Sequence, residues 1–136
     1  MSKLKIAVIG CGRFARSFVE LFKCHPYVEK VAVCDLIPEK REYCQKTFPQ
    51  VKVYSEYHAL LQDETIDAVI IAVPHPLHSE IASAALKAGK HVLLEKPVDI
   101  AVSKAKQLNK IAEESGKVFG IMFNQRTNDL FQRARE

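Results

Sequence analysis

A short glycine-rich segment, G-C-G-R-F-A at residues 10–15, follows directly on the apolar run 4–9. It fits the pattern G-x-G-x-x-A. In this pattern the first glycine allows a tight turn, the second lets a phosphate approach the backbone, and the third small residue lets a helix pack on the strand. The following helix presents unpaired N–H groups and a positive dipole end to an anion. The segment therefore predicts a strand, a phosphate-binding turn and a helix, with Gly10, Gly12 and Ala15 in the three roles.

A second apolar run, at residues 31–34, ends at Asp35, 20 positions after Ala15. Dinucleotide-binding folds place the acid that binds the adenosine ribose at about this spacing, and the other interpretation is a turn residue after a strand. Strand placement and spacing favour the ribose role. A carboxylate there repels a 2′-phosphate, so we expect NAD. Lys40 and Arg41 are expected to face solvent, but NADP stays possible because a basic side chain can fold over the adenosine.

Strand and helix patterns alternate along nearly the whole chain. Asp99 is placed to cap one expected helix, which Gly116 ends. Six strands with helices between them predict an α/β, doubly wound parallel sheet, the NAD(P)-binding Rossmann fold. The four later strands are expected at residues 51–54, 67–73, 91–94 and 118–123.

Composition excludes several function classes. The chain has 136 residues, 48% of them hydrophobic, which is enough for one domain with a full core. Its net charge of +4 comes from scattered residues without a basic block, which argues against a nucleic-acid partner. No apolar run reaches the roughly 18 residues of a membrane span, and we expect no membrane partner and no signal peptide. Four cysteines without a C-x-x-C pair indicate free thiols in a reducing cytoplasm.

Two histidines, His75 and His78, form an H-x-x-H pair at the expected start of a helix. Two ligands are too few for a metal site, and no acid or thiol follows at a matching spacing. We therefore expect no metal here and interpret His78 as structural or adjacent to a cofactor.

Three further segments carry a resemblance to one family. They are an apolar strand that runs into P-H-P-L-H at residues 66–78, G-K-H-V-L-L-E-K-P at residues 89–97, and F-N-Q-R at residues 123–126. With the glycine-rich turn and in this order, they resemble the N-terminal half of the Gfo/Idh/MocA oxidoreductases, which include glucose–fructose oxidoreductase and inositol dehydrogenase. The resemblance covers essentially the whole chain, with His75 where the family usually has asparagine.

The resemblance implies an NAD(P)-binding Rossmann domain at residues 1–123. Residues 124–136 are then the junction and first helix of a C-terminal substrate and oligomerisation domain that is otherwise absent. Relatives of this kind transfer a hydride between a nicotinamide cofactor and a sugar, cyclitol or related polyol, and are expected to form homo-oligomers, dimers or tetramers. The lysine of Glu-Lys-Pro binds and polarises the reacting hydroxyl, which is the role expected of Lys96. The family's catalytic histidine and aspartate lie in the second domain, so we expect this chain to bind cofactor without efficient turnover.

Other functions stay open beside this one. The main alternative is a non-catalytic, dinucleotide-sensing regulatory protein of the same fold, against which the intact Glu-Lys-Pro segment argues. A P-loop nucleotide triphosphatase is disfavoured because the glycine-rich turn lacks G-K-[ST]. The candidate catalytic residue is Lys96, and the candidate cofactor-binding residues are Gly10, Cys11, Gly12, Arg13, Phe14, Ala15, Asp35, Val73, Pro74, His75, His78, Glu95, Lys96, Asn124 and Arg126.

Overall fold

The computed structural model describes residues 3–135, which fold around one parallel sheet. The first strand is central. The second and third strands extend the sheet on one side of it, and the last three strands extend it on the other side. Within the described residues the strand order is β3-β2-β1-β4-β5-β6, which confirms the doubly wound α/β fold. The strands are β1 (Leu4–Ile9), β2 (Val28–Cys34), β3 (Lys52–Tyr54), β4 (Ala68–Ile71), β5 (His91–Glu95) and β6 (Phe119–Met122).

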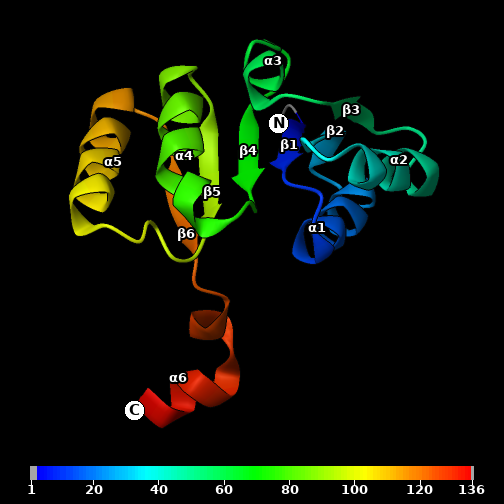
Figure 1. The fold of residues 1–136 in the computed structure, drawn as a ribbon. Coiled ribbons are helices and arrows are strands. Elements are labelled where there is room, and N and C mark those ends of the chain that lie inside the picture. The colour runs from blue at the N-terminus through cyan, green and yellow to red at the C-terminus, as the bar shows by residue number, and fades with distance from the viewer. Residues whose placement is uncertain (1–2, 136) are drawn as a thin grey trace.

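Helices connect the strands, and in Figure 1 α1 and α2 lie together at one side of the molecule while α4 and α5 lie at the other. Pro38 opens α2 as its first residue, a position where the missing N–H of proline is not needed. The α-helices are α1 (Arg13–Lys23), α2 (Pro38–Thr47), α3 (Tyr57–Leu61), α4 (His78–Lys87), α5 (Val102–Ser115) and α6 (Asp129–Arg135), and the 3-10 helices are η1 (His75–Leu77) and η2 (Asn124–Thr127).

The core has two halves, one on each face of the sheet. Alternate residues of a strand point to opposite faces, so Val8 packs with Val19 of α1 and Phe48 after α2. Its neighbour Ile9 joins the other cluster, which includes Leu108 of α5. Because helices cover both faces, the central strands are apolar along most of their length.

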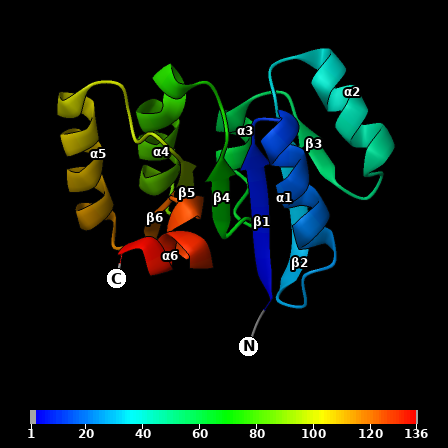
Figure 2. The same ribbon diagram turned by 90° about the horizontal axis from the view of Figure 1, so that it is seen from below.

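The carboxyl ends of the parallel strands meet at one edge of the sheet, which is the lower edge in Figure 1. Helix α6 lies beyond this edge, and the view from below in Figure 2 places it at the β5 and β6 side. Its Leu130 and Phe131 are 74% and 58% exposed. In a doubly wound sheet, ligands bind at the carboxyl edge, where the strand order switches direction between β1 and β4.

The expected helix cap at Asp99 is wrong. The helix α5 begins one residue after Ala101, and Asp99 Oδ1 accepts the Ala101 N–H at 2.9 Å from two positions upstream, as a turn residue does. Its Oδ2 accepts a hydrogen bond from the Ser79 hydroxyl of α4. These hydrogen bonds lower the pKa of Asp99 below its ordinary value. The expected end of the helix is confirmed, since Gly116 takes a left-handed conformation with φ of +64°.

Two expectations from composition can be compared with the structure. No helix among residues 3–135 is long and apolar enough to cross a membrane. All four cysteines are free thiols, and Cys11, Cys34 and Cys44 are buried. Burial raises the pKa of the Cys34 thiol to about 12, so it stays protonated in the core.

Candidate functional site

The turn between β1 and α1 passes so close to β4 that only glycine fits at residue 10. Gly10 has a φ of +102°, and a Cβ added there would lie 2.2 Å from the carbonyl oxygen of Ala72. The Gly10 N–H donates to the Cys34 carbonyl at 2.7 Å and so fixes the turn to the end of β2 as well. The first glycine of the pattern is therefore required by the packing of three strand ends.

The second glycine has a different environment. Gly12 precedes α1 as its N-cap with an ordinary φ of −71°, and no heavy atom lies within 4 Å of where its Cβ would be. The space beside it is open at the N-terminus of an 11-residue helix, where backbone N–H groups and the helix dipole favour an anion. Ala15 is only 1% exposed and packs α1 against the core. This arrangement fits a pyrophosphate at Gly12.

The carboxylate of Asp35 ties two loops together. Its Oδ2 accepts the Cys11 N–H at 2.7 Å, and its Oδ1 accepts the Ile37 N–H at 2.9 Å. The side chain is 10% exposed. Each carboxylate oxygen has a second acceptor position, so these two bonds leave capacity for ribose hydroxyls. Asp35 is therefore a turn residue and at the same time a carboxylate beside the glycine-rich turn.

Lys40 and Arg41 do not simply face solvent, and that expectation is wrong. The Lys40 Nζ lies 4.0 Å from Asp35 Oδ2. The Arg41 Nη1 donates to the carbonyl oxygens of Asp35 at 2.9 Å and Leu36 at 2.8 Å. Both residues lie in the first turn of α2, where the side chains fold back over the preceding loop.

Two cavities adjoin at the carboxyl edge, and both are lined by Gly12, Ala72 and Val73. The Asp35 cavity, of about 540 Å³, is the more apolar of the two. The Lys96 cavity, of about 380 Å³, opens on the other side of Gly12. The Asp35 cavity is further lined by Ile9, Gly10, Cys34, Asp35, Leu36, Ile37, Lys40, Tyr57, Pro74, Leu77, Glu80 and Ile81, and the Lys96 cavity by Arg13, Ala15, His75, His78, Glu95, Lys96, Asn124 and Gln125.

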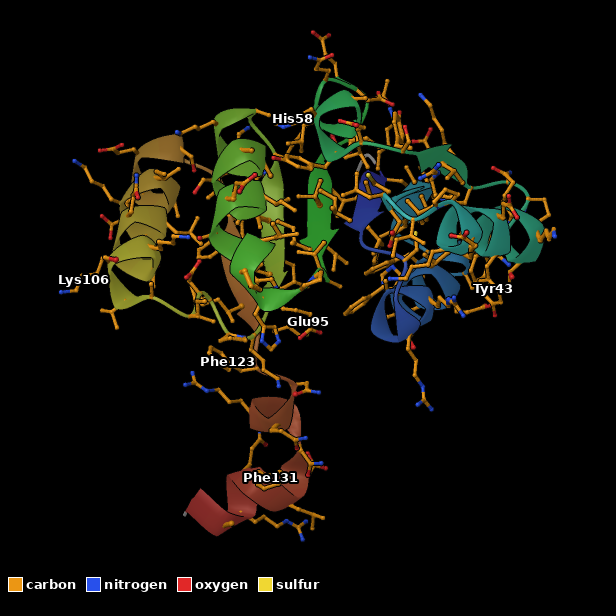
Figure 3. All side chains as sticks on the ribbon, viewed as in Figure 1. Tyr43, His58, Glu95, Lys106, Phe123 and Phe131 are labelled. Atoms are coloured by element: carbon orange, nitrogen blue, oxygen red, sulfur yellow. The ribbon has the colours of Figure 1, made fainter. Side chains whose placement is uncertain are left out.

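The last residue of β5 and its successor supply charge to the Lys96 cavity. Figure 3 shows Glu95 at the lower edge of the sheet, close to Phe123, with Phe131 of α6 farther out. The backbone N–H of Lys96 donates to Glu95 Oε2 at 3.3 Å. The Lys96 side chain is exposed, and within residues 3–135 no ion pair joins its ammonium to Glu95.

A buried histidine joins the ends of β4 and β5 at the base of this cavity. His78 is fully buried, with Nδ1 2.6 Å from the Pro97 carbonyl oxygen and Nε2 2.9 Å from the Val73 carbonyl oxygen. Both ring nitrogens therefore face backbone carbonyl oxygens, and a neutral imidazole can donate to only one of them. The His75 ring packs edge-on against it, with the two ring centres 5.4 Å apart. The two rings pack against each other, and a cofactor contact by either histidine stays a prediction.

Most of the expected cofactor-binding residues line these two cavities, and three need comment. Cys11 contributes its backbone N–H to Asp35, while its thiol is 1% exposed and packs in the core. The side chain of Phe14 lies outside the described part of the structure. Arg126 lines neither cavity and instead stacks over Phe123, with its guanidinium carbon 4.6 Å from the ring centre. A cofactor contact by Phe14 or Arg126 stays a prediction.

Sequence reasoning missed an apolar part of the Asp35 cavity. Leu36, Ile37 and Leu77 line it and are 68%, 44% and 37% exposed. The sequence signal that could have revealed this apolar surface is a pair of large apolar residues directly after the acid that follows a strand. Tyr57 also lines this cavity, and its Oη donates to Glu80 Oε1 at 3.0 Å.

The fold and the paired cavities define a dinucleotide-binding domain, and comparison with known proteins identifies its family. The model of the Gfo/Idh/MocA family, described as an oxidoreductase family with an NAD-binding Rossmann fold, matches residues 4–123. The chain belongs to this family, and the resemblance of its motifs is confirmed. Its cofactor class is accordingly the nicotinamide adenine dinucleotides.

Three relatives illustrate the similarity. The chain is 36% identical over its whole length to an uncharacterized oxidoreductase of Schizosaccharomyces pombe, of which it covers 38%. It is 38% identical over 85% of its length to dTDP-3,4-didehydro-2,6-dideoxy-alpha-D-glucose 3-reductase of Streptomyces violaceoruber, covering 34% of that protein. An NAD-binding protein from Listeria innocua superimposes with a TM-score of 0.89 and 34% identity, over 99% of this chain and 40% of that structure. The chain thus spans less than half the length of the relatives it matches.

Proposed function

We propose that this chain is the cofactor-binding half of an oxidoreductase that transfers a hydride between a nicotinamide cofactor and a sugar, cyclitol or related polyol. One observation carries the proposal. The open space at Gly12 lies between a cavity lined by a partly buried carboxylate, Asp35, and a cavity lined by an exposed lysine, Lys96. These three spaces correspond to the three parts of a nicotinamide dinucleotide, which are an adenosine, a pyrophosphate and a reactive ring.

Each part of the cofactor has matching residues in this arrangement. The adenosine is assigned to the Asp35 cavity, where Leu36 and Leu77 offer apolar surface and Asp35 accepts hydrogen bonds from the ribose. The pyrophosphate is assigned to Gly12 and the N-terminus of α1. The nicotinamide is then directed into the Lys96 cavity.

In the proposed reaction, a bound nicotinamide supplies the hydride acceptor or donor. Lys96 lies just beyond β5 with its side chain exposed, and its ammonium offers three hydrogen-bond donors to a substrate oxygen. Such an ammonium holds the reacting hydroxyl in place and stabilises negative charge that develops on its oxygen. His78 holds the Pro97 carbonyl and so fixes the backbone that follows Lys96.

The substrate class and the assembly are proposals as well. The similarity to a reductase of a dTDP-linked keto sugar and to an inositol 2-dehydrogenase supports a sugar or cyclitol substrate. We assign residues 124–136 to the junction and first helix of a substrate and oligomerisation domain, because Leu130 and Phe131 of α6 are largely exposed. A cytoplasmic homo-oligomer, dimer or tetramer, completes the proposal.

The experiment is an activity screen of the complete protein with NAD(H) and a panel of sugars and cyclitols, for the wild type and two variants. Lys96→Met is expected to lower turnover by roughly a hundredfold or more, because a donor to the developing charge is lost. NADH affinity should fall far less than turnover, because the adenosine and pyrophosphate are assigned to other residues. The control Lys106→Met makes the same change on α5, far from the site (Figure 3), and should have no effect.

Unchanged turnover in Lys96→Met would contradict the role of Lys96. NADH binding without turnover on any member of the panel would favour the regulatory alternative instead.

A further inference from the structure

Two buried thiols meet beneath the glycine-rich turn. Cys11 lies between the two glycines of the pattern, and Cys44 lies on α2. Each is 1% exposed, both belong to the same core cluster, and a hydrogen bond joins their thiols. The backbone N–H of Cys11 also donates to Asp35 Oδ2 at 2.7 Å. The thiol pair therefore connects α2 to the turn that is assigned to the pyrophosphate.

These thiols are protected while α2 lies in place. Burial raises the pKa of the Cys11 thiol, and the neighbouring Cys44 thiol raises it further. The thiolate is the form that attacks a disulfide, so the buried Cys11 thiol is unreactive. A reaction of this pair therefore requires α2 to move away.

Helix α2 is held to the sheet by few buried contacts. The structure describes all of α2, and Cys44 is the one buried residue within it. Nearer the surface, the Arg16 guanidinium carbon lies 3.5 Å from the centre of the Tyr43 ring, and Arg41 donates to two carbonyl oxygens of the preceding loop. A segment with few buried apolar contacts opens at a lower free energy than the whole fold. Local opening of α2 exposes Cys44 and uncovers its contact with Cys11.

From this arrangement we infer that Cys11 and Cys44 are an oxidation site, at which a disulfide forms and lowers the affinity for nicotinamide dinucleotides. The oxidant is an organic disulfide such as oxidised glutathione. While α2 is open, one cysteine attacks the oxidant, forms a mixed disulfide and releases one thiol. The other cysteine then displaces the second thiol. Two S–H groups thus become one S–S bond, and the oxidant gains two electrons and two protons.

The effect on binding follows from the position of Cys11. A covalent bond between two sulfurs is much shorter than a contact between thiols, so the link draws Cys11 toward α2. The hydrogen bond to Asp35 and the open space at Gly12 both depend on the backbone at this residue. This effect rests on the proposed placement of the pyrophosphate at Gly12, whereas formation of the link does not.

The test treats the complete protein with oxidised glutathione at neutral pH and then removes the excess. Peptide mapping without reduction identifies the linked cysteines. Fluorescence titration measures the NADH affinity before oxidation, after it, and after reduction by dithiothreitol. Cys44→Ala lacks one partner of the link, and Cys24→Ala is the matched control, because Cys24 is an exposed free thiol.

We expect a link between Cys11 and Cys44 in the wild type and in Cys24→Ala. In both, the NADH affinity should fall at least about tenfold on oxidation and return with dithiothreitol. Cys44→Ala should keep its own NADH affinity within about twofold after the same treatment. The peptide map of the wild type decides whether the link forms without the need for any variant.

Three outcomes would overturn the inference. They are a peptide map without a link between these two residues, a linked protein with unchanged NADH affinity, and a Cys44→Ala variant that loses affinity on oxidation as the wild type does. In all three NADH binds the untreated wild type, so the proposed function stands. If NADH does not bind the untreated wild type, the proposed function is contradicted and the inference with it.

Discussion

The Asp35 cavity and the Lys96 cavity adjoin at Gly12 but are built in different ways. In the Asp35 cavity, backbone N–H groups of two loops donate to the carboxylate. Lys40 lies beside this carboxylate, and Arg41 donates to the Asp35 carbonyl oxygen. In the Lys96 cavity, the lysine side chain is exposed, and part of the wall comes from Asn124 and Gln125 after the last strand. The carboxylate of the first cavity is held by contacts within the Rossmann fold, whereas the lysine of the second is exposed.

This difference separates binding from chemistry. A carboxylate that backbone hydrogen bonds already hold loses little conformational entropy when a ligand binds, which favours affinity. An exposed lysine has no such constraint, and catalysis needs its position fixed by substrate and by further groups. We therefore expect changes near the Asp35 cavity to alter stability and affinity, and changes at Lys96 to alter turnover.

The largest expected effect is on stability and tests the packing of Gly10 against Ala72, which lines both cavities. Gly10→Ala should destabilise the fold by roughly 3 kcal/mol or more, because its Cβ would meet the Ala72 carbonyl at 2.2 Å and its φ is +102°. The measurement is urea denaturation. Gly116→Ala is the control, because it has a φ of +64° but open space around it, and should cost about 1 kcal/mol. Equal losses in the two variants would refute the close approach of this turn to β4.

The next effect separates the two glycines of the pattern. Gly12→Ala should weaken NADH binding roughly thirtyfold, about 2 kcal/mol, because a methyl group would enter the space assigned to pyrophosphate. Stability should fall by no more than about 1 kcal/mol, since nothing in the fold occupies that space. Fluorescence titration and urea denaturation measure the two quantities. A variant with normal affinity would show that the pyrophosphate lies elsewhere.

A smaller effect tests the ribose role of Asp35. Asp35→Ser should weaken NADH binding about tenfold and narrow the gap between NADH and NADPH, because the acceptor and the negative charge are both lost. Asp35→Asn is the companion variant, since it keeps an acceptor oxygen for one of the two N–H groups. Competitive titration of both nucleotides measures the change. Unchanged relative affinities in Asp35→Ser would refute the ribose assignment.

The smallest effect concerns the loop after Lys96. Hydrogen bonds from the Ser79 hydroxyl and the Ala101 N–H lower the pKa of Asp99, so the unfolded chain binds its proton more tightly than the folded chain. The stabilisation is complete above the unfolded pKa of about 4 and is lost as pH falls through the lower, folded value. At pH 7, Asp99→Asn should therefore be slightly less stable than the wild type. Melting curves between pH 3 and pH 7 should show that this difference disappears toward the acid end, and a difference independent of pH would contradict the account.

The backbone of the fold was predictable because its signals are local. The G-x-G-x-x-A turn, the apolar run at β4 and the glycine at residue 116 each specify a local conformation, and the structure confirms the doubly wound sheet they predict. The spacing from the turn singled out Asp35, whose ribose role stays a prediction. Its two bonds to backbone N–H groups depend on how two loops meet and have no sequence signal.

Side-chain direction accounts for most of what the sequence did not reveal. Lys40 and Arg41 occur in a polar helix that reads as solvated, and only the packing of α2 against the end of β2 turns both toward the preceding loop. Nothing in the sequence predicts the hydrogen bond of Tyr57, which forms because contact between α3 and α4 brings its hydroxyl to Glu80. Leu36 follows the acid after β2, and nothing in the sequence predicts that it is 68% exposed beside the cavity.

A crystal structure of the chain with NADH bound tests most directly whether the two cavities form one dinucleotide site. The account predicts the adenosine ribose on Asp35, the pyrophosphate over Gly12 and the nicotinamide in the Lys96 cavity, with Lys96 beside its reactive face. A nucleotide in the opposite direction, or one bound away from Gly12, would contradict it.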